Sequence, residues 1–70
     1  REHLGRASAA AQTVKLADLI DNSHSIVEHD PGFARVYMSE KEALLEVLTR
    51  GDASLHRQAS AIVSNYRSKL

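Results

Sequence analysis

The chain has 70 residues, with nine Lys and Arg, nine Asp and Glu, and a formal net charge of zero. This length allows one small domain, and the balanced charge, with neither a basic stripe nor an acidic tail, argues against a nucleic-acid-binding protein. The absence of cysteine excludes disulfides and thiolate metal sites, and the short apolar runs predict neither a signal peptide nor a membrane span.

The first predicted helix covers about residues 10–27, and the small residues 8–11 allow it to begin earlier. We expect it to end near residues 28–30, because Pro31 disfavours helical backbone at the residue before it and Gly32 interrupts the pattern. Asp30 is then the residue that initiates a turn.

A polar stripe runs along this helix and consists of Lys15, Asp18, Asn22 and Ser25. Their spacing of three, four and three residues places them on one side of a helix, where they can converge on one bound group. Much of the remaining circumference is apolar: Val14, Leu16, Ala17, Leu19, Ile20 and Ile26. The pattern predicts a buried or half-buried helix. Spacing alone favours the alternative in which Asp18 and Asn22 face solvent or hydrogen-bond a neighbouring helix, because Asp and Asn on helices are usually solvated.

The second predicted helix covers about residues 33–50, with apolar residues at helical spacing: Phe33, Tyr37, Leu44 and Leu48, flanked by Val36, Leu45 and Val47. Alternatively, Ser39 and Glu42 form a capping box that begins a shorter helix. Gly51 is positioned to follow Arg50 in the left-handed conformation that often ends a helix.

The third predicted helix covers about residues 53–69 and is capped by Asp52 or Ser54. One face of it is apolar: Leu55, Ala59, Ile62, Val63, Tyr66 and Leu70. No segment alternates like a half-buried strand. The sequence therefore predicts an all-α fold of three helices.

The segment Lys15-Leu16-Ala17-Asp18 is followed by two further polar residues. Asn22 lies four residues after Asp18, and the hydroxyl residue Ser25 lies seven residues after it. This pattern resembles the last metal-binding helix of HD-superfamily phosphohydrolases, most closely the guanosine tetraphosphate (ppGpp) hydrolases of the RelA/SpoT type. Three later segments resemble the next helix of bacterial members: Phe33-Ala34-Arg35-Val36-Tyr37, Glu40-Lys41 and Leu44-Leu45-Glu46-Val47-Leu48. The resemblance covers about residues 13–48 and implies that residues 1–70 are the C-terminal portion of an HD-type helical domain.

The resemblance also implies roles for the polar stripe. Asp18 would be a carboxylate ligand of a divalent metal, with Mn²⁺ the expected ion. Asn22 would lie beside the substrate ribose or the attacking water, Ser25 would contact the nucleotide, and Lys15 would lie near substrate phosphate. The implied reaction is attack of a metal-bound water on a phosphoryl group of a nucleotide pyrophosphate such as ppGpp.

The sequence departs from the family pattern in two respects. His24 stands where Arg is usual beside the hydroxyl residue, and Leu19 follows Asp18 where a basic residue is common, so positive charge is lost near an anionic substrate. The upstream His and His-Asp doublet of the superfamily site do not precede Lys15, and His3 lacks a suitable context. We therefore expect a fragment of a longer enzyme that is inactive by itself.

The remaining histidines are expected outside the site. His29 and Asp30 form a doublet, but it follows the motif and lies in a predicted turn, so we interpret it as part of that turn. His24 is expected to be a partly exposed polar residue, and His56, between charged and polar neighbours, is expected to be solvated.

A second hypothesis is a non-enzymatic helical interaction module. In it, the apolar helix faces form a homo-oligomer interface and the polar stripe is a buried network. Neither hypothesis requires a nucleic-acid or membrane partner. The enzyme hypothesis requires a nucleotide pyrophosphate substrate.

Overall fold

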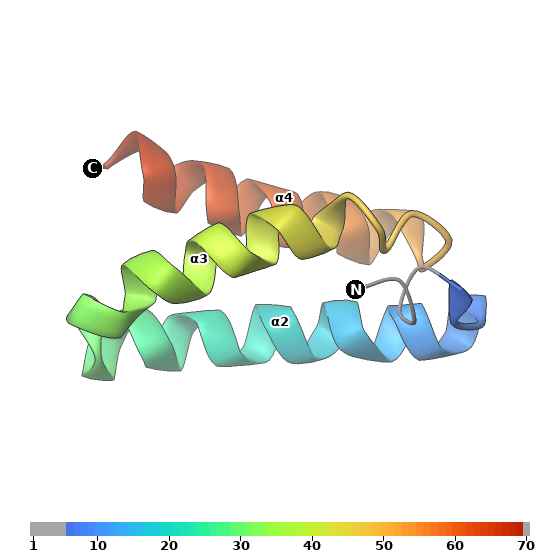
Figure 1. Cartoon of the computed structure of the whole chain (residues 1–70), viewed down its shortest axis with the longest axis horizontal. Coiled ribbons are helices and arrows are strands. Elements are labelled where there is room, and N and C mark those ends of the chain that lie inside the picture. Colours follow the sequence, from blue (N-terminus) through green and yellow to red (C-terminus); the bar gives the residue numbers. More distant parts are fainter. Residues whose placement is uncertain (1–5, 70) are drawn as a thin grey trace.

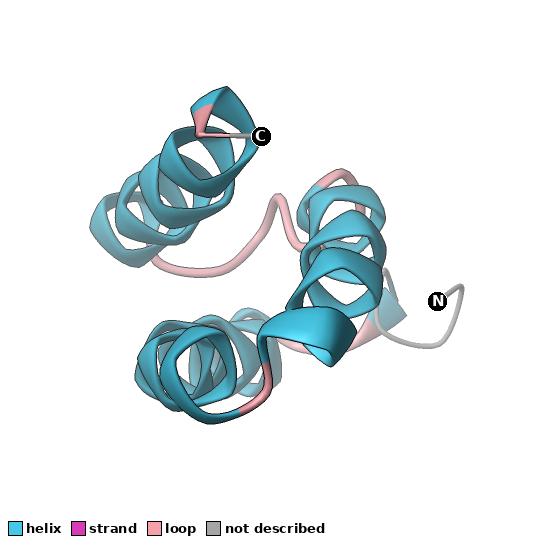
Figure 2. Ribbon diagram, turned by 90° about the vertical axis from the view of Figure 1, so that its left-hand side faces the viewer, coloured by secondary structure: helices cyan, strands magenta, loops and turns pink. Residues whose placement is uncertain are grey.

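The computed structural model describes residues 6–69, which form three packed α-helices. Helix α2 spans Ala9–His29, α3 spans Pro31–Leu45 and α4 spans Ala53–Ser68. Along the chain α3 reverses the direction of α2, and α4 reverses it again (Figure 1). Viewed nearly end-on, the helices occupy the corners of a triangle (Figure 2), and each packs against the other two. The all-α prediction is confirmed, and none of the described residues is in a strand.

A single residue separates α2 from α3. The backbone N–H of Asp30 donates to the Ile26 carbonyl at the end of α2. Its carboxylate oxygen Oδ1 accepts from the Phe33 N–H, 3.2 Å away, and so caps α3. Pro31 then occupies the first helical position, where the missing N–H costs nothing. The predicted end of the first helix and the role of Asp30 in the turn are both confirmed.

The core lies between the three helices and contains a cluster of buried side chains: Leu16, Leu19, Tyr37, Met38, Leu45, Leu48, Ala59 and Val63. The predicted apolar face of α4 is confirmed, with Leu55, Ile62 and Tyr66 partly buried against the cluster. Leu70 and His3 lie outside the described residues. The fold therefore derives its stability from one apolar stripe on each helix.

Several residues expected to be apolar contacts are exposed instead. Val14 is 58% exposed, so α2 buries one face rather than most of its circumference. On α3, Phe33 is 47% and Val36 52% exposed, because the core contacts of that helix are made by Tyr37, Met38 and Leu45.

The predicted extent of the second helix is wrong. It ends at Leu45 rather than at Arg50, and Ser39 and Glu42 lie inside it rather than at its start. Residues 46–52 form a loop, which we call the docked loop because two of its backbone N–H groups bind α2. Arg50 N–H donates to Gln12 Oε1 over 2.9 Å, and Asp52 N–H donates to Thr13 Oγ1 over 2.8 Å. The Arg50 N–H therefore binds a side chain of α2 instead of a carbonyl of a longer α3.

The predicted left-handed conformation of Gly51 is also wrong, since no described glycine has a positive φ. Gly51 is required for close approach instead. A Cβ atom there would lie 2.8 Å from Leu16 Cδ1 and 3.2 Å from backbone atoms of Gln12 and Thr13. The docked loop therefore rests directly on the backbone of α2.

The start of α4 is confirmed as predicted. Asp52 Oδ1 accepts from the Leu55 N–H, 2.9 Å away, so Asp52 rather than Ser54 is the N-cap. Within residues 6–69, no helix is both long and apolar enough to span a membrane.

We expect Gly51→Ala to lower the free energy of unfolding by about 1–3 kcal/mol, because the added methyl group overpacks a contact made partly with backbone. Gly32→Ala is the matched control, since a Cβ there meets nothing within 4 Å. It lies in the first turn of α3, so Ala should be neutral or stabilising by up to about 1 kcal/mol. Urea unfolding followed by circular dichroism measures the free energy of unfolding of both variants. Equal destabilisation by the two substitutions would contradict the close approach of Gly51 to α2.

Candidate functional site

The polar stripe lies on the solvent side of α2. The helix buries Leu16, Leu19 and Ser23, while all four stripe residues are exposed. The stripe is therefore not a buried network, contrary to the interaction-module hypothesis. The hydroxyl that α2 does bury is that of Ser23, which donates to the Leu19 carbonyl over 2.6 Å.

Three of the four stripe residues line a shallow pocket of about 170 Å³ between α2 and α3, which we call the α2–α3 pocket. Its lining residues are Lys15, Asp18, Leu19 and Asn22 from α2, and Tyr37, Lys41 and Leu44 from α3. Ser25 lies further along α2 and does not line it. The sequence thus predicted the α2 wall of this pocket, and the fold adds a wall from α3.

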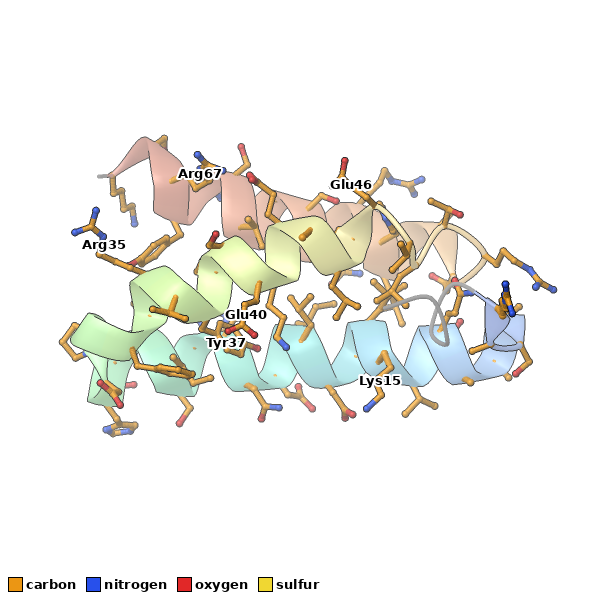
Figure 3. The ribbon with its side chains drawn as sticks, viewed as in Figure 1. Lys15, Arg35, Tyr37, Glu40, Glu46 and Arg67 are labelled. Atoms are coloured by element: carbon orange, nitrogen blue, oxygen red, sulfur yellow. The ribbon has the colours of Figure 1, made fainter. Side chains whose placement is uncertain are left out.

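The α3 wall consists of an aromatic ring and an ammonium group. Tyr37 lies between α3 and α2 (Figure 3), and its hydroxyl donates to the Leu19 carbonyl over 3.4 Å. Lys41 Nζ lies 5.0 Å from the centroid of the Tyr37 ring, in a cation–π contact. Lys15 extends from the outer side of α2, at the rim of the pocket (Figure 3).

Sequence reasoning missed Tyr37 and Lys41 as site residues. It assigned Tyr37 to the apolar core, which is correct, since the side chain is buried. The four-residue spacing from Tyr37 to Lys41 indicates that their side chains are neighbours on a helix. The spacing does not show which neighbouring helix, or which face of it, Tyr37 and Lys41 contact.

The α2–α3 pocket contains one carboxylate, that of Asp18, beside the amide of Asn22 one turn away. Oxygen donors of this kind suit a hard divalent cation such as Mg²⁺ or Mn²⁺, which needs several of them. Among residues 6–69, no group of three or more His, Asp or Glu residues is placed to hold a metal ion. Within the described residues, the pocket therefore offers a single carboxylate, which is too few ligands to hold a metal ion by itself.

The other histidines have separate surroundings. His29 is exposed, and its neighbour Asp30 is occupied as a helix cap, in keeping with the turn interpretation. His24 is exposed and lines a groove of about 430 Å³ next to α4 rather than the α2–α3 pocket.

The expectation that His56 is solvated is wrong. Its Nε2 lies 2.9 Å from the Leu45 carbonyl oxygen at the end of α3. Because a carbonyl only accepts, Nε2 carries the proton, and Nδ1 is left to accept from the Ser60 hydroxyl 3.4 Å away. Ser60 and His56 resemble a nucleophile and its base. The His56 ring, however, is oriented by a backbone carbonyl, and this hydrogen bond connects α4 to the end of α3. We therefore assign His56 a structural role.

Comparison of the sequence with protein-family models and with curated proteins, and of the fold with solved structures, gives no match in any of the three. The functional argument consequently depends on the residues of the pocket and their surroundings.

The three polar residues that α2 contributes to the pocket are available for function because their side chains do not support the fold. Within residues 6–69, the side chains of Lys15, Asp18 and Asn22 form no hydrogen bond or ion pair. We expect replacement of each by Ala to change the free energy of unfolding by no more than about 0.5 kcal/mol, since the sites are exposed and Ala favours helix.

Leu19→Ala is the comparison for these variants, because Leu19 is buried on the same helix. We expect this substitution to lower the free energy of unfolding by about 2–5 kcal/mol. Urea denaturation of the four variants measures the difference. A loss above about 1 kcal/mol for any of the three polar variants would show that the residue supports the fold.

Proposed function

We propose that this chain is the C-terminal part of an HD-type metal-dependent phosphohydrolase domain of a cytoplasmic enzyme, acting on a nucleotide pyrophosphate such as ppGpp. The observation that supports the proposal is the α2–α3 pocket, which is lined by a carboxylate, an amide and two lysines. Within residues 6–69, the side chains of Lys15, Asp18 and Asn22 form no hydrogen bond or ion pair. The motif that resembles the family's metal-binding helix contributes the α2 side of this pocket.

In this proposal each residue of the polar stripe on α2 has a different role. Asp18 is a carboxylate ligand of a divalent ion, for which we propose Mn²⁺. When bound, such an ion lowers the pKa of a coordinated water and stabilises charge on a phosphoryl group. Asn22 presents both an acceptor and donors to a substrate hydroxyl or to the attacking water. Lys15, at the rim, faces substrate phosphate, and Ser25, one turn beyond Asn22, contacts the nucleotide outside the pocket.

The structure shows where the two residues that depart from the family pattern, Leu19 and His24, are located. Leu19 is 2% exposed and belongs to the core cluster, so the residue after Asp18 contributes an apolar part of the pocket lining and no charge. His24 is exposed, but it lines the groove beside α4. Positive charge at the pocket therefore has to come from Lys15 and from α3.

Asp18→Ala in the complete domain tests the metal role. We expect loss of Mn²⁺ binding, measured by electron paramagnetic resonance titration, together with loss of pyrophosphate release, because a positioned carboxylate ligand is removed. Asp21→Ala is the matched control, as Asp21 is also an exposed carboxylate of α2 but does not line the pocket. The 70-residue chain alone should bind Mn²⁺ weakly.

Unchanged Mn²⁺ stoichiometry and pyrophosphate release in the Asp18→Ala domain would contradict the proposal. An equal loss in the Asp21→Ala domain would show that general negative charge, rather than one ligand, explains the effect.

The helical interaction module is the second candidate, favoured by the exposed apolar side chains of α3. Phe33 and Val36 are 47% and 52% exposed, are three residues apart, and lie on adjacent positions of the helix surface. The Phe33 ring also contacts the Tyr37 ring, with centroids 6.4 Å apart. In this candidate, a second copy of the chain covers these residues.

We expect the double variant Phe33→Ser with Val36→Ser to abolish self-association if α3 is the interface, while Asp18→Ala leaves it unchanged. Sedimentation velocity measures the oligomeric state. Substitutions in the core are unsuitable probes, because Leu48 is fully buried and Ile62 packs against the core, so charges there would unfold the chain. A monomeric wild-type chain at high concentration would eliminate this candidate.

A further inference from the structure

We propose that Lys41 of α3 binds an anionic phosphoryl group in the α2–α3 pocket, so that the pyrophosphate part of the ligand lies between α2 and α3. The inference rests on the proposed function and deepens it, since it assigns a substrate-binding residue on a second helix. Its starting point is the position of Lys41, which lines the same pocket as Asp18 and Asn22.

The Lys41 side chain is held in place before any ligand binds. Its ammonium lies 5.0 Å from the centroid of the Tyr37 ring. That ring is itself fixed, because it is 7% exposed, belongs to the core cluster and donates a hydrogen bond to the Leu19 carbonyl. A lysine restrained in this way loses less conformational freedom on binding than a free surface lysine does.

The charge of Lys41 is not neutralised within the fold. The ion pair formed among residues 6–69 is that of Arg67 with Glu42, on another side of α3. Arg35 and Arg67 line a second small cavity, but Arg67 is already paired with Glu42. Lys41 is therefore the better candidate for an anionic ligand.

The charges that line the α2–α3 pocket favour an anion. They are the ammonium groups of Lys15 and Lys41 and the carboxylate of Asp18, a net charge of one positive. A divalent cation on Asp18 would increase this positive charge. Glu40 precedes Lys41 in the sequence, but it does not line the pocket. A compact phosphoryl or pyrophosphate group matches the ammonium group of Lys41 on the α3 side of the pocket, with Lys15 at the rim.

Titration of the isotope-labelled chain with inorganic pyrophosphate, followed by ¹H–¹⁵N nuclear magnetic resonance, tests the inference without requiring enzymatic activity. We expect shift changes at Lys15, Asn22 and Lys41 that diminish as salt is added. Lys41→Gln should weaken binding at least threefold, and Lys41→Arg should restore it to within about twofold because the positive charge is kept.

Two control variants separate a site from general charge effects. Lys69→Gln removes an exposed lysine that lines a different groove and should leave pyrophosphate affinity unchanged. Glu40→Gln removes a neighbouring negative charge and should not weaken binding. Wild-type affinity in the Lys41→Gln chain, equal weakening by Lys69→Gln, or shift changes confined to other surfaces would each overturn the inference.

The complete domain distinguishes this inference from the proposed function. There, Lys41→Gln should raise KM for the pyrophosphate substrate while kcat and Mn²⁺ stoichiometry are retained. If Asp18→Ala removes Mn²⁺ but Lys41→Gln leaves KM unchanged, the Lys41 inference alone is wrong. If pyrophosphate binds through Lys41 but Asp18→Ala leaves metal binding intact, the proposed function is wrong and the anion site stands.

Discussion

The fold depends on the attachment of the docked loop to α2. The Gln12 side chain is fully buried, and both ends of its amide are bound, with Oε1 accepting from the Arg50 N–H and Nε2 donating to the Ala7 carbonyl. A buried amide is tolerated only when it is hydrogen-bonded in this way. Gly51 supplies the space that brings the two backbones together. This attachment determines where α3 ends and where α4 begins, because Asp52, the cap of α4, is bound to Thr13.

The attachment also positions the candidate site. Helix α3 is held at one end by the single-residue junction at Asp30 and at the other by the docked loop, so it lies along α2 (Figure 1). Its buried face then places Tyr37 against Leu19, and Lys41, one turn later, beside the polar stripe. A pocket with polar groups from two helices is the consequence of core packing, although its polar groups contribute little to that packing.

The surface of this small domain serves two separate purposes in the proposals. The α2–α3 pocket has to remain open to a phosphorylated ligand, whereas the exposed ring of Phe33 and the exposed methyl groups of Val36 would be covered in an oligomer. Both features lie on α3. The same helix can therefore present a charged wall to a ligand and an apolar edge to a second copy, since residues at different positions around a helix face different directions.

The sequence by itself determined what depends on residues close together along the chain. The three helices, the apolar face of α4, the turn at Asp30 and a cap at Asp52 or Ser54 follow from periodicity and from the preferences of residues close together in sequence. Only the tertiary structure decided the end of α3, the conformation of Gly51, the partial burial of His56 and the position of Lys41 opposite Asp18. These features depend on contacts such as that of Gln12 with Arg50, 38 residues apart, and periodicity within one helix does not specify which neighbour its faces meet. The polar stripe could be found from its spacing, but its second wall required the packing of α3.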